Sequence, residues 1–308
     1  MTSPKSGKKR VKVIMVVLAG IVVSLFTYDF LALHNVKKYD ASLNRDPVTG
    51  IIEGGAPKWS GPEDSSTAVL FIHGFVGVGN NFSDLPGLMA KDGYRVREML
   101  LPGHGTSPIE FRDTPREAFI ESVLKEIADL KEKHEKVVLV SHSMGAALTT
   151  IAASAADLDG IILGAPYYKV SYKWYYILPV ETWSKITSPF IRWVYKSDGF
   201  IRVNRKEAKQ QIISYRWIPA KGSRTLKQIG ARAFDSATLS NVTEPVLMLV
   251  SEGDNAAAPK AARKAFEQMS STDKTIITLE NSDHHIYWDN DREEVYRHCL
   301  EFVAKVAS

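Results

Sequence analysis

The feature that most constrains the fold is a short run of residues at 137–145. The apolar stretch Val-Val-Leu-Val leads directly into Ser-His-Ser-Met-Gly, and small residues typical of a helix follow to about residue 155. This order predicts a buried strand, a tight turn and a helix, with Ser143 at the tip of the turn. Ser141 and Gly145 flank it, where bulky side chains would collide as the strand folds back. The helix N-terminus favours developing negative charge, which is typical of an activated serine.

Strand and helix patterns alternate along most of the chain. The clearest helix is predicted over 113–134, where Thr114 to Glu117 forms a capping box, Pro115 takes the first helical position, and apolar residues recur at helical spacing. Alternating strands and helices predict an α/β fold, with a mostly parallel sheet covered by helices on both faces. Apolar runs typical of its strands lie at 68–72, 94–101, 137–140, 160–163, 246–250 and 275–279.

Candidate partners for Ser143 follow the last two of these strands. A serine nucleophile needs a base, and the base needs an acid that orients it. The strand at 246–250 is followed by Ser-Glu-Gly-Asp at 251–254, and the strand at 275–279 by Glu-Asn-Ser-Asp-His-His at 280–285. Because the carboxyl ends of parallel strands meet at one edge of the sheet, we expect these side chains near Ser143.

We assign Ser143 as the nucleophile, His284 as the general base and then acid, and Asp254 as the residue that fixes the imidazole. Glu252 is the alternative to Asp254, although it lies nearer the strand, and His285 is the alternative to His284. A metal site at the histidine pair would need two further ligands at suitable spacing, and we predict no metal.

A second turn is expected to complete the site. The strand at 68–72 ends in the glycine-rich sequence His-Gly-Phe-Val-Gly, so the backbone N–H of Phe75 can point to the same place as that of Met144, the residue after the nucleophile. Such a pair would form an oxyanion hole. The other nearby polar residues are expected to be structural, with the His142 side chain directed away from the site; they are His73, His104, His142 and Asp283.

The N-terminus carries most of the positive charge. The whole chain has a net charge of +4. Residues 1–38 have a net charge of +6, so the remaining residues have a net charge of −2. Because the positive charge lies in the N-terminal segment, no nucleic-acid partner is predicted. Sixteen uncharged residues at 13–28 follow five basic ones. We expect an uncleaved membrane anchor, with the N-terminus in the cytoplasm and the body outside. The alternatives are a cleaved signal peptide, which would leave a secreted protein, and a buried soluble helix.

Residues 165–227 break the alternation. They hold thirteen of the thirty aromatic residues and thirteen Lys and Arg against three acidic residues. A loop of that length without structure is implausible, so an inserted lid is predicted. The predicted organisation is a basic stub with the anchor, a tether, a first core part, a lid and a second core part, at residues 1–38, 39–50, 51–164, 165–235 and 236–308.

Five separated motifs together resemble a known family. Over roughly residues 65–305 the chain is similar to bacterial carboxylesterases and monoacylglycerol lipases, which are serine α/β-hydrolases with a small lid. The motifs are HGFVG at 73–77, LPGHGTSP at 101–108, SHSMG at 141–145, EGD at 252–254 and SDHHIYWD at 282–289.

The resemblance implies that the base is His284 rather than His285, because the family pattern S-x-H-x-x-x-x-D places it between Ser282 and Asp289. It also implies that the N–H groups of Phe75 and Met144 hold the oxyanion. The chain departs from the pattern at residue 141, where serine replaces glycine, and in the Asn-Ala-Ala-Ala-Pro segment at 255–259.

These observations predict a membrane-anchored serine hydrolase that cleaves carboxylic esters of lipophilic acyl chains through an acyl-enzyme on Ser143. The expected partners are a small-molecule or lipid ester and the membrane, and no cofactor is needed. The alternative is another serine acyl hydrolase, namely an S33-type peptidase, a thioesterase or an amidase. A non-catalytic binding protein is expected to have lost a member of the triad, and none is lost here.

Overall fold

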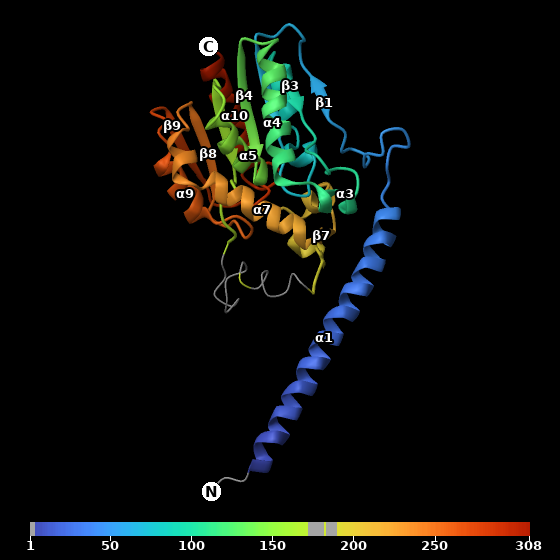
Figure 1. Ribbon diagram of the computed structural model, residues 1–308. Coiled ribbons are helices and arrows are strands. Elements are labelled where there is room, and N and C mark those ends of the chain that lie inside the picture. The colour runs from blue at the N-terminus through green and yellow to red at the C-terminus, as the bar shows by residue number, and fades with distance from the viewer. Residues whose placement is uncertain (1–3, 172–181, 183–189) are drawn as a thin grey trace.

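A sheet of seven strands forms the centre of the molecule (Figure 1). The computed structural model describes residues 4–171, 182 and 190–308. Strand β1 pairs antiparallel with β3, and the other neighbouring strands are parallel. The strands, in order across the sheet, are β1 (Lys58–Ser60), β3 (Arg95–Glu98), β2 (Thr67–Ile72), β4 (Lys136–His142), β5 (Gly160–Gly164), β8 (Val246–Ser251) and β9 (Lys274–Leu279).

The predicted mostly parallel sheet is therefore confirmed, and each of the six predicted strands is present. Strand β1 was not predicted, because three residues at a half-exposed edge are too few to show an apolar pattern.

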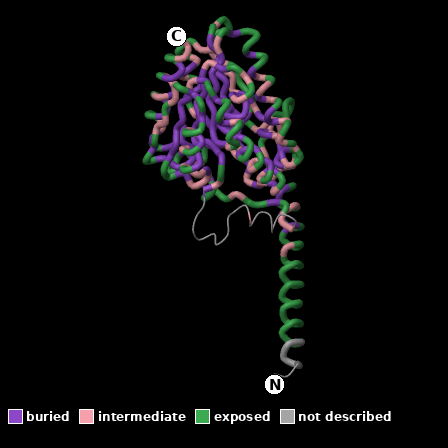
Figure 2. Tube along the Cα trace, turned by 60° about the vertical axis from the view of Figure 1, so that its left-hand side comes forward, coloured by how far each residue is buried: buried purple, intermediate pink, exposed green. Residues whose placement is uncertain are grey.

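Helices cover both faces of the sheet, and the central strands are buried on both sides (Figure 2). Leu70 and Leu139 point to one face and Phe71 and Val140 to the other, so each strand contributes to two separate cores. The first core is covered by α4 (Arg116–Lys131), α5 (Met144–Ala153), α7 (Ala220–Ala233), α8 (Ser236–Ser240) and α9 (Pro259–Gln268). The second is covered by η1 (Gly79–Phe82), α2 (Leu85–Lys91) and α10 (Arg292–Ala307).

The helix predicted over 113–134 is shorter, and its predicted capping box is wrong. A separate helix, α3 (Pro108–Asp113), ends just before Thr114, and α4 begins only at Arg116. The Thr114 hydroxyl donates to the carbonyl oxygen of Glu110 at 3.2 Å instead of capping α4. A residue before proline is biased towards extended backbone, and both Thr114 and Pro115 are extended here.

Helix α1 (Pro4–Ala41) projects from the domain (Figure 1). Among the described residues one helix, Lys9–Ala41, is long and apolar enough to cross a membrane, and no residue of its most apolar window is buried. From Phe26 onwards the helix contacts the domain, where the Phe26 ring meets that of Phe190 and the Tyr28 hydroxyl donates to the carbonyl oxygen of Trp193 at 3.1 Å. It also continues to Ala41, three residues into the segment predicted as a tether.

The contact between α1 and the domain centres on one ion pair. Asp29 is only 6% exposed, and its carboxylate accepts hydrogen bonds from the backbone N–H and the guanidinium of Arg192 at 2.5–2.9 Å. Ala32 and Val36, one and two turns further on, pack against two tryptophans. These are Trp193 and Trp217, which belong to a two-stranded hairpin of β6 (Trp193–Tyr195) and β7 (Trp217–Pro219).

The hairpin lies within the segment predicted as a lid. The described part of that segment also contains η3 (Asp198–Phe200), η4 (Lys206–Gln210) and α7, whereas residues 172–181 and 183–189 of the predicted lid lie outside the described residues. Tyr215 ties the segment to the core, because its hydroxyl donates to the carbonyl oxygen of Gly103 and accepts from the N–H of Thr106.

Candidate active site

Ser143 stands at a sharp turn between β4 and α5. Its backbone has φ 55° and ψ −113°, a left-handed region that a side chain rarely adopts. Gly145 makes the turn possible, since a Cβ there would lie 2.0 Å from the carbonyl oxygen of Ile72. Residue 141 is serine where the family pattern has glycine. The Ser141 hydroxyl donates to the carbonyl oxygen of Ile162 at 2.7 Å, so the buried hydroxyl has a hydrogen-bond partner.

The serine, histidine and acid that were predicted to converge do so at the carboxyl ends of β4, β8 and β9. The Nε2 of His284 lies 2.8 Å from the Ser143 hydroxyl oxygen, and its Nδ1 lies 2.8 Å from a carboxylate oxygen of Asp254. An ionised carboxylate can only accept, so Nδ1 carries the proton and Nε2 is free to accept from Ser143. All three residues are buried, which strengthens these polar contacts.

Asp254 is itself held in place. Its other carboxylate oxygen accepts the backbone N–H groups of Ala256 and Ala257 at 2.7 and 2.8 Å. These bonds fix which oxygen faces the imidazole. The carboxylate therefore presents a single, oriented acceptor to His284.

The alternative residues have other partners. Glu252 forms an ion pair with Arg263 at the surface. Asp283 accepts the backbone N–H groups of Asn255 and His284, which agrees with a role in shaping the turn.

Among the described residues, no group of three or more His, Cys, Asp or Glu side chains is placed to hold a metal ion.

The residues that frame His284 are themselves held by hydrogen bonds. Ser282 donates its hydroxyl proton to Asp291 at 2.8 Å, and the carboxylate of Asp289 accepts the N–H of Asp283 at 2.7 Å. Asp289 further accepts the N–H groups of Asn204 and Arg205. These bonds attach the inserted segment to the loop at 280–291 that carries His284, here called the histidine loop.

The glycine-rich turn after β2 lies against Ser143. A Cβ on Gly74 would come within 3.2 Å of the Cβ of Ser143, so the backbone of this turn passes directly beside the serine. Among the hydrogen bonds of the described residues, none uses the backbone N–H of Phe75 or of Met144. Both donors thus remain available to a ligand at Ser143.

Two buried histidines and an asparagine hold this turn. His73 accepts the N–H of Leu101 at Nε2, so its Nδ1 donates to the carbonyl oxygen of Gly74. His104 accepts the N–H of Val76 in the same way. Burial lowers the pKa of His73 to about 4 and that of His104 well below its usual value, so both stay neutral and keep these tautomers. Their predicted structural role agrees with these contacts.

Asn81 was not singled out from the sequence. Its side-chain oxygen accepts the N–H of Gly74 at 2.9 Å. The only sequence signal is its place shortly after the glycine-rich turn.

The prediction for His142 was wrong. Its side chain does not leave the site but lines the pocket, and its Nε2 donates to the carbonyl oxygen of His284 at 3.0 Å. Burial lowers the pKa of His142 to about 3, so the ring is neutral and its Nε2 carries the proton. His142 therefore positions the backbone of the histidine loop. The strand turns sharply just after it, and strand alternation could not predict its direction.

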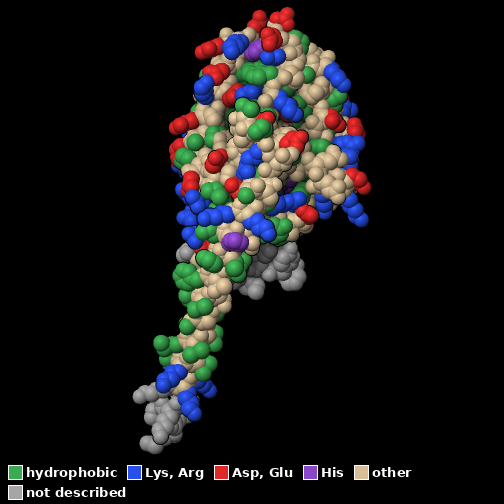
Figure 3. All heavy atoms as spheres, turned by 90° about the vertical axis from the view of Figure 1, so that its right-hand side faces the viewer, with side chains coloured by type: hydrophobic (Ala, Val, Ile, Leu, Met, Phe, Trp, Pro, Cys, Tyr) green, Lys and Arg blue, Asp and Glu red, His purple; other side chains and the backbone are tan. Residues whose placement is uncertain are grey.

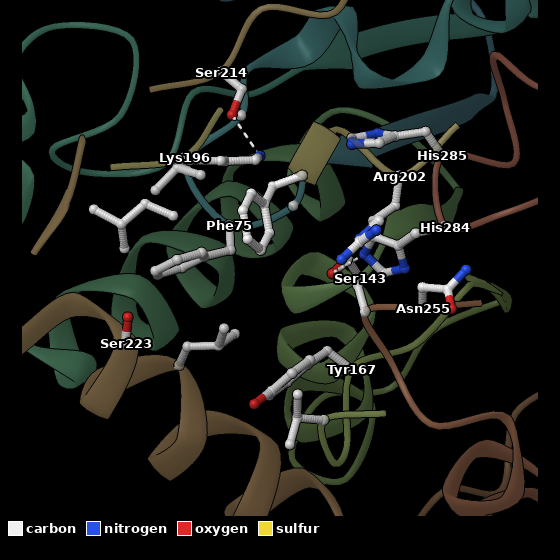
Figure 4. A pocket seen from close by; sticks show the side chains of 18 of the residues that line it. Phe75, Ser143, Tyr167, Lys196, Arg202, Ser214, Ser223, Asn255, His284 and His285 are labelled. Carbon is white, nitrogen blue, oxygen red and sulfur yellow. Dashed lines mark hydrogen bonds between the residues drawn. The ribbon is translucent and has the colours of Figure 1, made fainter. Parts of the chain in front are cut away.

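A pocket of about 350 Å³ opens above Ser143 (Figure 4). Its apolar lining comes from the glycine-rich turn, the segment after β5, the β6–β7 hairpin and α7, and includes Phe75, Val170, Val194, Ile218 and Leu226. In Figure 4, Tyr167 lies on one side of Ser143, while Lys196, Arg202 and His285 lie on the other. The pocket thus has an apolar and a basic part that meet at the serine.

Three features together define an α/β-hydrolase: the sharp turn at Ser143 between β4 and α5, the mostly parallel sheet, and the order serine, acid, histidine along the chain. A sequence profile of the family described as serine aminopeptidase, S33, matches residues 63–291. The chain belongs to this family.

Individual relatives are similar over most of the chain. A thermostable monoacylglycerol lipase of Bacillus sp. (strain H-257) is 27% identical over 265 residues, 83% of this chain and 97% of the relative. A carboxylesterase of Bacillus subtilis (strain 168) is 21% identical over 241 residues, 78% of this chain and 93% of the relative. A solved structure from work on two metagenome-derived lipolytic enzymes, LipS and LipT, is 26% identical with a TM-score of 0.73, and the match covers 83% of this chain and 99% of that one.

Proposed function

We propose that this chain is a membrane-anchored serine hydrolase that cleaves carboxylic esters of lipophilic acyl chains through an acyl-enzyme on Ser143. It is a carboxylic ester hydrolase, as its named relatives are. The observation that carries the proposal is the hydrogen-bond chain from Ser143 through His284 to Asp254 at the base of a partly apolar pocket.

The reaction follows from the proposed roles. His284 takes the hydroxyl proton at Nε2 as the oxygen of Ser143 attacks the ester carbonyl carbon, and Asp254 stabilises the imidazolium. The backbone N–H groups of Phe75 and Met144 hold the oxyanion; losing one such donor typically costs about 3–4 kcal/mol of barrier. The alcohol leaves with the proton from His284. Water then attacks the acyl-enzyme by the same steps and releases the acid.

The pocket supports an ester with an apolar acyl chain. Phe75 and Leu226 offer apolar surface close to Ser143, and each buried CH₂ of a chain contributes about 0.8 kcal/mol. The named relatives include a monoacylglycerol lipase and a carboxylesterase. A lipid monoester is therefore the proposed substrate class.

Helix α1 supports a membrane anchor. Its mostly exposed part, residues 11–28, spans about 27 Å at about 1.5 Å per residue, close to the roughly 30 Å hydrocarbon core. Lys and Arg side chains lie at both ends of this apolar part (Figure 3). The excess of basic residues before it favours an N-terminus in the cytoplasm and a catalytic domain outside. Signal cleavage followed by secretion is the alternative.

We further propose that residues 165–235 act as a lid carried by the anchor. The contacts of Asp29 with Arg192 tie the helix to the β6–β7 hairpin, which lines the pocket through Val194. The mouth of the pocket would then stay close to the membrane surface, where lipid esters are found.

The test is hydrolysis by the full chain in detergent micelles of glycerol monoesters with graded acyl length. We expect activity that rises with chain length and is lost in Ser143→Ala and His284→Ala, while Glu252→Gln stays active. A panel with matched thioester and aminoacyl amide substrates tests the alternative, a peptidase or thioesterase. Faster cleavage of the amide than of the ester would contradict the proposal.

A further inference from the structure

Basic side chains line the pocket without carboxylates to balance them. Lys196 and Arg202 lie in its wall, and the described lining residues include no Asp or Glu. A cation held away from bulk water is costly unless an anion or hydrogen bonds compensate it. A site that concentrates cations in this way is suited to an anionic ligand.

Lys196 directly follows β6. Its ammonium donates to the Ser214 hydroxyl at 3.0 Å, and no described carboxylate pairs with it. Burial, together with the guanidinium groups of Arg216 and Arg202, lowers the pKa of Lys196 to about 8. The ring of His142 also lies within its electrostatic range. Lys196 is therefore still mostly charged at pH 7 but short of counter-charge.

Arg202 lines the same pocket, within electrostatic range of Lys196. Its guanidinium lies 5.3 Å over the ring of Phe200 and forms no ion pair with a described residue. Its carbonyl oxygen accepts the backbone N–H of His285 at 2.9 Å. This bond places Arg202 next to the residue that follows the proposed base.

His285 contributes an unused polar atom. The residue is 8% exposed, and its Nδ1 has no hydrogen-bond partner among the described residues. Burial, with contributions from His142, His284 and Lys196, lowers its pKa well below the usual value. The ring is therefore neutral, lines the pocket and keeps one N–H group that can donate (Figure 4).

We propose that Lys196, Arg202 and His285 form a subsite for an anionic group, a phosphate or a carboxylate, carried by the alcohol part of the ester. The inference rests on the proposed function and specifies its substrate class. His284 must protonate the leaving oxygen, so the alcohol lies on the histidine side, where Arg202 and His285 are found. The acyl chain then lies along Phe75 and the apolar part. Two cations and an N–H donor can form charge-assisted hydrogen bonds to a phosphate or a carboxylate.

The test uses matched esters that differ in the charge of the alcohol. The first pair is 4-(butyryloxy)benzoate and its methyl ester, and the second is a 1-acylglycerol 3-phosphate and the 1-acylglycerol with the same chain. The measured quantity is the ratio of kcat/KM for the anionic ester to that for the neutral one. Intrinsic reactivity of the esters cancels when this ratio is compared between the wild-type full chain and its variants.

We expect the ratio to fall about tenfold in Lys196→Met and in Arg202→Met, and further in the double variant. The exposed Lys206→Met on η4 is the matched control and should leave it unchanged. If the kcat/KM ratio falls only for the first pair of esters, the subsite binds a carboxylate. If the ratio falls only for the second pair, the subsite binds a phosphate. An unchanged ratio for both pairs, in variants that still cleave the neutral esters, would overturn the subsite and leave the proposed function intact.

A second measurement needs no variant. Deprotonation of Lys196 should lower the ratio in the wild-type chain as pH rises from 7 to 9, since its pKa is about 8. A ratio that stays constant over this range would also count against the subsite. A wild-type chain that cleaves neither neutral nor anionic esters would overturn the proposed function and the subsite together.

Discussion

Asp254→Asn gives a sharp test of how the acid acts. One carboxylate oxygen of Asp254 accepts two backbone N–H groups, at 2.7 and 2.8 Å, and the other faces Nδ1 of His284. Asparagine keeps the two backbone bonds only if its carbonyl oxygen occupies the first position. Its NH₂ group then faces Nδ1 and can only donate. The imidazole must move its proton to Nε2, where it can no longer accept from Ser143.

This change removes the base while leaving the packing intact. The same tautomer fault in a serine–histidine–aspartate triad lowers kcat about 10⁴-fold, which corresponds to roughly 5 kcal/mol of barrier. We expect a loss of this size in kcat for 4-nitrophenyl butyrate at pH 7.5, with a melting temperature within a few degrees of the wild type. The assay is a stopped or continuous absorbance measurement with equal amounts of folded protein.

Glu252→Gln is the matched control, because this residue pairs with Arg263 at the surface and should lose less than about twofold in activity. A loss below tenfold in Asp254→Asn, or an equal loss in Glu252→Gln, would refute the assignment of Asp254.

Three further outcomes are expected. Gly145→Val should prevent a stable fold, because its Cβ would lie 2.0 Å from the carbonyl oxygen of Ile72; a melting curve like that of the wild type would contradict this. Asp29→Leu should lower the free energy of unfolding by about 1–3 kcal/mol through loss of charged hydrogen bonds, and Arg192→Met should add little to it in a double-mutant cycle, measured by denaturant titration. The lowered pKa of His73, about 4, stabilises the fold above the unfolded pKa near 6.5; stability should therefore fall as pH drops from 6.5 to 4, and urea midpoints that do not change over this range would contradict it.

The sheet and the convergence of Ser143, His284 and Asp254 were accessible from the sequence for a physical reason. The apolar runs mark strands that are buried on both faces, and parallel strands bring their carboxyl ends to one edge. Polar residues placed directly after three such runs must then approach each other. The distances follow from the fold rather than from any local pattern.

Other parts of the site depend on the path of the chain in three dimensions. His142 reaches the site through a contact with the loop after β9, and Asn81 through a contact with the turn after β2, and no periodicity encodes either contact. Lys196 and Arg202 lie in an insertion without regular alternation, so their common location could not be inferred. The contact of Asp29 with Arg192 joins residues 163 positions apart, so no local pattern could predict it.

The most direct measurement of the central claim is labelling with a fluorophosphonate, followed by mass spectrometry of the intact full chain and of its peptides. We predict one added phosphonyl group, located on Ser143 in the wild type, absent in Ser143→Ala and formed far more slowly in His284→Ala. Rapid labelling of another residue, or labelling of Ser143→Ala at the wild-type rate, would contradict the account.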